Sequence, residues 1–136
     1  MEIRRLTEND FKQFSALVID MYKEVDATIN EFQALNMLMH EVHGHDDFMA
    51  FGWFNDKKLV GMSYGRKFNK KSFYFSGIYV IIRNNEGLKK LIDFSFATIK
   101  DSGYTSWLAD ASNPNIQSIL QRYDVAVKFI QYEGKL

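Results

Sequence analysis

A short polar segment, residues 83–87 (RNNEG), has the residue types and the position that suit the binding of an anion. Residues 72–82 before it are mostly aromatic or β-branched, which predicts a buried strand. Apolar residues at helical spacing come after it, at Leu88, Leu91, Ile92, Phe96 and Ile99. The segment therefore joins the carboxyl end of a strand to the amino end of a helix, where free backbone N–H groups and the helix dipole attract negative charge.

The elements around this segment form a strand–helix–strand unit. Gly103 ends the helical pattern, and residues 104–110 (YTSWLAD) predict a second strand. A crossover through a helix pairs its two strands in parallel. Since open α/β sheets bind ligands at the carboxyl ends of such strands, we predict the site at this edge.

Two helices and a hairpin are predicted before this unit. Thr7 with Asp10 marks a helix start, and an apolar stripe follows over residues 11–25. Thr28 with Glu31 repeats the signal for a second helix that ends near Gly44. Residues 48–54 and 59–65, on either side of NDKK, predict an antiparallel hairpin. After the unit, we expect Asn113 to cap a short helix that begins at Pro114, and residues 125–132 to form one last strand.

The composition limits the classes of function. A chain of 136 residues, 46% of them hydrophobic, fits one domain, residues 1–136. Lys plus Arg equals Asp plus Glu at 17 each, which argues against binding to nucleic acid or to an anionic membrane. There is no cysteine, and no apolar run approaches the roughly 20 residues that span a bilayer. We therefore expect a cytoplasmic protein.

The histidines form a rival constellation. All 3 lie within residues 40–45, next to acidic side chains: His40, His43 and His45, with Glu41, Asp46 and Asp47. A zinc-binding helix places two histidines four residues apart, whereas His40 and His43 are three apart, and Gly44 is expected to end the helix before His45. We therefore predict no metal, and interpret the histidines as a solvated helix end that favours the negative end of the dipole.

The order and spacing of these elements resemble the GNAT superfamily of N-acetyltransferases over nearly the whole chain. IRRLTENDF and the helix after it resemble the start of that family, and AFGWFNDKKLVGMSYG resembles its second and third strands. The acetyl-coenzyme A motif of the family is a strand, Gln or Arg, two residues, Gly, one residue, Gly or Ala, and a helix with paired aliphatic residues. Here Arg83 matches the Arg, and Leu91 with Ile92 matches the pair.

The resemblance implies an α/β (α+β) fold: a mixed, mainly antiparallel sheet with helices on both faces and a central parallel pair of strands splayed to admit the cofactor, acetyl-coenzyme A. The implied contacts with the cofactor come from Ile78, Tyr79, Val80, Arg83, Asn84, Asn85, Glu86, Gly87, Leu88 and Asn113.

The loop departs from the motif at two positions. Glu86 and Leu88 stand where the family has small residues, and Gly87 falls between them. Side chains there would obstruct the approach of a pyrophosphate to the backbone amides. A carboxylate in the first helical turn stabilises the helix by about 0.3 to 1 kcal/mol, and it occupies the field that a phosphate would use. Glu86 is thus either a helix-start residue or a competitor that weakens cofactor binding.

Groups for proton transfer are the second departure. The family commonly uses a Glu or a water chain as base and a Tyr as acid, but residues 72–82 hold no Asp, Glu or His. The tyrosine position of the family falls on Leu120, and Tyr123 lies one helical turn later. Tyr123 is therefore the candidate acid, with a packing tyrosine as the alternative. Asp110 is the candidate base, with a loop-starting acid as the alternative.

The third departure is at the end. The family usually finishes with a hairpin, and residues 125–136 leave room for about one strand, so a second subunit could cover the exposed edge as a homodimer. Two functions follow from the resemblance. One is an acyltransferase that moves acetyl from acetyl-coenzyme A to a small-molecule or peptide amine. The other is a catalytically degenerate relative that binds or regulates through protein contacts.

Overall fold

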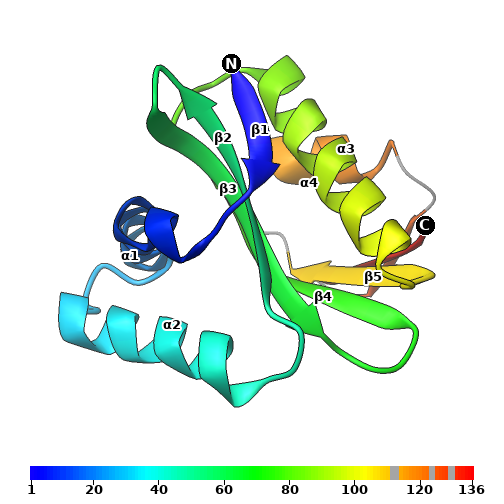
Figure 1. Cartoon of the computed structure of the whole chain (residues 1–136), viewed down its shortest axis with the longest axis horizontal. Coiled ribbons are helices and arrows are strands. Elements are labelled where there is room, and N and C mark those ends of the chain that lie inside the picture. Colours follow the sequence, from blue (N-terminus) through cyan, green and yellow to red (C-terminus); the bar gives the residue numbers. More distant parts are fainter. Residues whose placement is uncertain (111–113, 123–124, 129–130) are drawn as a thin grey trace.

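The computed structural model describes residues 1–110, 114–122, 125–128 and 131–136, and its strands form one sheet (Figure 1). The sheet has seven strands in the order β1-β2-β3-β4-β5-β7-β6. Their bounds are β1 Glu2–Arg5, β2 Met49–Asn55, β3 Lys58–Lys67, β4 Ser72–Val80, β5 Ser106–Asp110, β6 Val125–Lys128 and β7 Gln131–Lys135. Only β4 and β5 pair in parallel among these strands, which confirms the predicted mixed, mainly antiparallel sheet.

The helices cover both faces of the sheet, as predicted. They are the 3₁₀ helix η1 Glu8–Asp10, α1 Phe11–Val25, α2 Glu31–Gly44, α3 Asn85–Asp101 and α4 Pro114–Leu120. Figure 1 shows α1 and α2 on one side of the sheet and α3 on the other. Each face has its own core: Phe14, Val18 and Leu38 belong to one, and Leu91 and Trp107 to the other. The sheet thus separates two hydrophobic clusters.

The first two helices begin by the same device at different places. Thr7 donates its backbone N–H to Asp10 Oδ2 at 2.8 Å, as the sequence predicts. The predicted start of the second helix at Thr28 is wrong, because Thr28 lies in a turn. The backbone N–H of Thr28 donates to Asp26 Oδ1 at 3.0 Å. Asn30 caps α2 instead, since Asn30 Oδ1 accepts from Gln33 N at 2.8 Å and Gln33 Oε1 accepts from Asn30 N at 3.0 Å.

Asp10 also makes a two-pronged ion pair with Arg4. Arg4 Nη1 and Nη2 lie 2.8 Å from Asp10 Oδ2 and Oδ1, and Asp10 is buried. The hydrogen bonds from Arg4 hold the pKa of Asp10 at about 2, below its usual value. A carboxyl whose pKa is lowered by folding stabilises the protein above its unfolded pKa, and this contribution is lost as the pH falls through the folded pKa.

We therefore expect Asp10→Asn to lower the free energy of unfolding at about pH 6 by about 1 to 2 kcal/mol. The difference between the wild-type protein and the variant should shrink as the pH falls from about 4 toward about 2, where the wild-type carboxyl also loses its charge. Urea unfolding of both proteins over this range measures it. A difference that stays constant with pH would contradict the role of the ionised carboxylate.

The two hairpins differ in their agreement with the sequence. β2 and β3 form the predicted hairpin around a turn in which Asp56 and Lys57 have positive φ, 50° and 66°. The single last strand predicted over residues 125–132 is wrong: β6 and β7 form an antiparallel pair, and β7 adds to β5. The strand shortage that suggested a homodimer is therefore absent, and a dimer has no support from it.

Candidate functional site

The parallel strands β4 and β5 separate in the middle of the sheet. They pair from Ser72 with Ser106 to Phe75 with Ala109, and no further. The next residue of β5, Asp110, pairs only with β7, while β4 runs on to Val80. The splay that the resemblance implies is thus present, and it opens at Ser76.

A β-bulge coincides with this point. Gly65 of β3 pairs with Phe75, but Tyr64 pairs with Gly77, which leaves Ser76 as an extra residue in β4. A bulge bends its strand and re-aims the side chain of the extra residue. Phe75 packs into the core beneath α3, whereas Ser76 bonds to α2 on the opposite face.

A cleft of about 470 Å³ lies at the carboxyl end of β4. Of the residues predicted to touch the cofactor, six line it: Tyr79, Val80, Arg83, Asn84, Asn85 and Leu88. Ile78, Glu86 and Gly87 do not line it. α1 contributes Glu24 and α4 contributes Ile116, so the cleft lies between elements of both faces.

The amino end of α3 forms one wall of this cleft. The helix begins at Asn85, three residues earlier than the first residue of the predicted apolar pattern, because Asn84 caps it by accepting from Gly87 N at 3.1 Å. Leu88 N already bonds to the carbonyl of Asn84 at 3.0 Å. The amides of Asn85 and Glu86 are therefore the ones without an acceptor inside the helix, and they can bind an anion together with Arg83.

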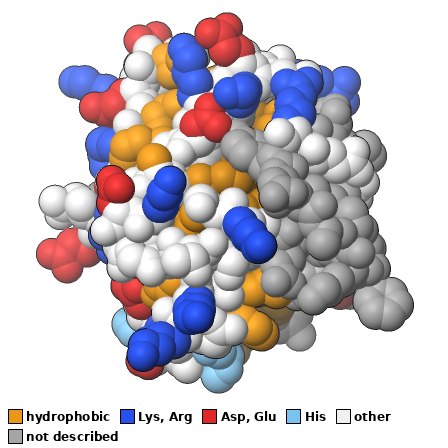
Figure 2. All heavy atoms as spheres, turned by 90° about the vertical axis from the view of Figure 1, so that its right-hand side faces the viewer, with side chains coloured by type: hydrophobic (Ala, Val, Ile, Leu, Met, Phe, Trp, Pro, Cys, Tyr) orange, Lys and Arg blue, Asp and Glu red, His pale blue; other side chains and the backbone are white. Residues whose placement is uncertain are grey.

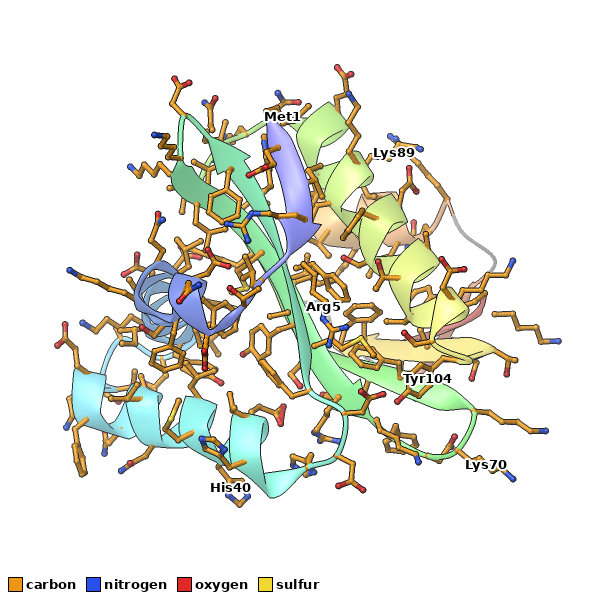
Figure 3. All side chains as sticks on the ribbon, in the orientation of Figure 1. Met1, Arg5, His40, Lys70, Lys89 and Tyr104 are labelled. Atoms are coloured by element: carbon orange, nitrogen blue, oxygen red, sulfur yellow. The ribbon has the colours of Figure 1, made fainter. Side chains whose placement is uncertain are left out.

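Glu86 does not obstruct the cleft with its bulk. Its side chain is 76% exposed and pairs with Lys90 Nζ at 3.3 Å along the outer face of α3. Figure 3 shows Lys89, the neighbour of Lys90, pointing away from the sheet on the same helix. The carboxylate still adds negative charge near the helix amino end, so the interpretation as an electrostatic competitor stays a prediction.

Close packing explains why residue 87 is a glycine. A Cβ there would overlap Cζ2 and Cη2 of the Trp53 ring and lie 2.8 Å from Cε2. Gly87 therefore lets the first turn of α3 rest on the indole of β2. Leu88 beside it is buried in the core, where its side chain also borders the cleft.

A half-buried carboxylate lies on the other face of the sheet at the splay. Glu41 of α2 accepts hydrogen bonds from Ser76 Oγ at one oxygen and from Arg66 Nε, at 2.9 Å, at the other. Sequence reasoning missed both Glu41 and Ser76 as functional residues. The signal for Glu41 was its spacing, because it follows the buried residues Ala34 and Leu38 at helical intervals.

Two tyrosine hydroxyls lie on the same face. Tyr22 and Tyr64 are 3.1 Å apart through their hydroxyl oxygens, and burial raises the pKa of both. Tyr79, at the cleft, donates to Glu24 Oε1 at 3.0 Å. Partial burial and this carboxylate raise the pKa of Tyr79 to about 12, so its phenol keeps its proton at neutral pH.

The structure describes only part of the residues that the sequence offers as candidates for proton transfer. Asp110 is the last residue of β5, next to the splay, and its side chain is outside the described part of the structure. Asn113 and Tyr123 lie outside the described residues altogether. Leu120, at the tyrosine position of the family, is buried in the core. The roles predicted for these residues stay predictions.

Two of the histidines lie together at the end of α2, where the ring centroids of His40 and His45 are 6.0 Å apart. Figure 3 shows His40 on the outer side of α2, and the structure places His45 Nε2 3.7 Å from Glu41 Oε2. In the described part of the chain, no group of three or more His, Cys, Asp or Glu side chains could hold a metal ion.

None of the described helices is long and apolar enough to cross a membrane. Figure 2 shows acidic and basic side chains interspersed on one face of the molecule.

Comparison with known proteins finds similarity in structure and none in sequence alone. No protein-family model and no curated protein sequence matches the chain. PaiA N-acetyltransferase from Thermoplasma acidophilum, solved in complex with coenzyme A, matches with a TM-score of 0.69 and 16% identity over 99% of this chain and 98% of that one. Ribosomal-protein-alanine N-acetyltransferase from Brucella melitensis matches with a TM-score of 0.71 and 15% identity over 100% of both chains.

A further match is an acetyltransferase of the GNAT family from Staphylococcus aureus Mu50, with a TM-score of 0.77 and 13% identity over 99% of this chain and 98% of that one. Identities this low are evidence of a shared fold, and each match extends over nearly the full length of both proteins. The splayed strands, the bulge and the helix on either face agree with the likeness. The chain therefore has the fold of the GNAT N-acetyltransferases.

Proposed function

We propose that the protein transfers the acetyl group of acetyl-coenzyme A to an amine of a small molecule or peptide. The observation that carries the proposal is the separation of β4 from β5 at Ser76, beside a cleft that ends at the amino terminus of α3. This arrangement offers a slot for an extended thioester and, at one end, donors for its phosphates. Two similar proteins are N-acetyltransferases, one of them solved with coenzyme A, which supports the same activity here.

The chain can supply each contact that such a donor needs. Ile78 to Val80 pair with β3 on one side and lie beyond the last pair with β5 on the other, so those of their backbone amides that face the splay can hold the pantetheine arm. The amides of Asn85 and Glu86, with Arg83, suit the pyrophosphate because all three are donors or cations. We place Asn113 further along the cofactor, and Asp110 and Tyr123 as candidates for proton transfer. The amine attacks the thioester directly while both substrates are bound. The cytoplasmic location stays a prediction.

Calorimetric titration of the purified protein with acetyl-coenzyme A tests the proposal. We expect a dissociation constant on the order of micromolar. Arg83→Met should weaken binding about tenfold, the equivalent of about 1.4 kcal/mol, because it removes the cation beside the phosphates. Lys100→Met, a matched loss of one cation in the last turn of α3, should leave the affinity unchanged. Glu86→Gln should tighten binding about two- to fivefold, since it removes a negative charge from the helix amino end.

Absence of binding at millimolar concentration would contradict the proposal. The protein would then be a GNAT-fold protein without donor binding, and contacts with other proteins would become the favoured function. Equal losses in Arg83→Met and Lys100→Met would show that net charge, rather than the cleft, governs the affinity.

A further inference from the structure

We propose that Ser76 and Glu41 form the proton acceptor for the attacking amine. The hydroxyl of Ser76 contacts the amine, and the carboxylate of Glu41 receives the proton through it. This inference rests on the proposed function, since it assigns a base to that reaction. Residues 72–82 contain no Asp, Glu or His that could act as the base. In this proposal the carboxylate comes from α2 instead.

The position of Ser76 places its hydroxyl at the opening between the strands. Phe75 is the last residue of β4 that pairs with β5, and Ser76 is the residue left over by the bulge. The bulge turns Ser76 toward α2, away from the core beneath α3. A thioester that lies in the splay along β4 would therefore pass this hydroxyl, and an amine approaching from the α1 and α2 face would meet it.

Arg66 of β3 holds the carboxylate of Glu41 in place. Arg66 Nε lies 2.9 Å from Glu41 Oε2, and the side chains of the two residues are only 19% and 16% exposed. The guanidinium also lies over the ring of Tyr74, 4.9 Å from its centroid. Because Arg66 occupies one carboxylate oxygen, the other is directed to Ser76. The same pair would serve a purely mechanical role if it only tied α2 to the sheet.

The other ionisable groups that face Glu41 come from three elements. His45, at the end of α2, has its Nε2 3.7 Å from Glu41 Oε2. Burial, and to a lesser extent the negative charge of Glu41, raise the pKa of Tyr22 in α1 and of Tyr64 in β3. Both phenols therefore stay neutral at neutral pH. Arg66 is the permanent cation. The carboxylate of Glu41 therefore lies beside one permanent cation and near two phenols that keep their protons.

In the proposed step, the proton passes from the ammonium to Glu41 through the hydroxyl of Ser76. An ammonium N–H gives its proton to Ser76 Oγ while the Ser76 hydroxyl gives its own proton to Glu41 Oε1. The freed lone pair of the amine forms a C–N bond with the thioester carbonyl carbon, and the C–S bond then breaks. The sulfur leaves with the bonding electron pair and takes a proton from solvent, while the nitrogen, which still carries one proton more than an amide, releases that proton to solvent. Glu41 later returns its proton to solvent, so the products are an N-acetyl amide, a thiol and one proton.

The test uses propylamine as the acceptor and follows release of the coenzyme A thiol, corrected for the reaction without enzyme. The wild-type protein, Glu41→Gln and Ser76→Ala are compared, with Glu31→Gln as the matched control. Glu31 is on the same helix, but its side chain is 79% exposed. Its carboxylate makes one long ion pair, 3.9 Å from Lys23 Nζ. Affinity for acetyl-coenzyme A is measured for each protein by calorimetry, and unfolding in urea checks that each variant is folded.

We expect a pH signature that a mechanical role would not give. In the wild-type protein, kcat/KM for total amine should be nearly flat from about pH 7 to about pH 9, since the proposed base deprotonates the bound ammonium. In Glu41→Gln, kcat/KM should be about 100-fold lower at about pH 7 and rise about tenfold per pH unit, because only free amine reacts. Ser76→Ala should lose about tenfold with a flat profile, since a water can take the place of the hydroxyl.

Each other outcome is decisive. A uniform loss in Glu41→Gln at every pH, or activity equal to that of Glu31→Gln, would overturn the inference and leave the pair as a tie between α2 and the sheet. Unchanged activity in Ser76→Ala would remove Ser76 from the path. Binding of acetyl-coenzyme A by the wild-type protein without acetyl transfer to excess propylamine would also count against a base at the splay. Failure of the wild-type protein to bind acetyl-coenzyme A would instead overturn the proposed function itself.

Discussion

Replacing Gly65 by alanine is expected to lower the free energy of unfolding by about 3 kcal/mol, the upper end of the usual cost of overpacking. A Cβ at this position would overlap the carbonyl oxygen of Tyr74 and lie 2.8 Å from both its carbonyl carbon and Cε1 of Phe73. The obstacle is backbone of the neighbouring strand, which cannot turn aside as a side chain can. Relief therefore requires β3 and β4 to move apart.

The same substitution should abolish most acetyl transfer in the protein that remains folded. The register shift lies between Tyr64 and Gly65, and it is this shift that leaves Ser76 unpaired at the splay. Urea unfolding and thiol release measure the two effects. Gly44→Ala is the control, because a Cβ there meets only the ring of His40 at 3.4 Å, and we expect a change within about 0.5 kcal/mol. Equal costs at the two positions would contradict the close approach of β3 and β4.

Gly87→Ala is expected to cost about 2 kcal/mol of unfolding free energy and to weaken binding of acetyl-coenzyme A at least about tenfold. Alanine favours a helix over glycine by about 1 kcal/mol, but the new Cβ overlaps the Trp53 ring. The first turn of α3 must then lift from the sheet. This moves the Asn84 cap and the free amides of Asn85 and Glu86, and Asn84 and Asn85 line the cleft.

A double-mutant cycle separates this steric cause from a general effect on the helix. Trp53→Phe removes the part of the indole that the Cβ would meet, so Gly87→Ala should cost less in that background than in the wild-type protein. Calorimetry and urea unfolding of the four proteins give the coupling. If the two substitutions are additive in both measurements, contact with Trp53 is not what requires the glycine.

The elements of the fold could be predicted because their signals are local. The helical stripe of α1, the turn between β2 and β3, and the change from strand to helix after β4 are each encoded within a few neighbouring residues. Boundaries failed where two local signals competed. Thr28 has a helix-start pattern, but its backbone N–H donates to the carboxylate of Asp26 in a turn, so the helix does not begin there. The last hairpin was missed because residues 125–132 are one run without a strong turn signal.

The candidate site could be predicted only at the loop that follows β4. Arg83 to Leu88 are contiguous and follow a strand, so their position at the cleft could be inferred from the chain order. The bond from Ser76 to Glu41 joins residues 35 apart and depends on the bulge in β4 and on Arg66, which holds the other oxygen of Glu41. The sequence shows that residue 86 carries a carboxylate. It does not show that the side chain of Glu86 points along α3 and pairs with Lys90.

The two cores that the sheet keeps apart bear on how such a protein could change over time. Gly87, Leu88 and Leu91 rest on the core beneath α3, while α1 and α2 rest on the core of the opposite face. Substitutions that lie far apart and share no partner usually add in their effects. If the proposed function holds, the parts of α1 and α2 other than Glu24 and Glu41 can therefore be remodelled for a new amine while the core beneath α3 keeps its packing, so acceptor preference can evolve without renewed selection on that core.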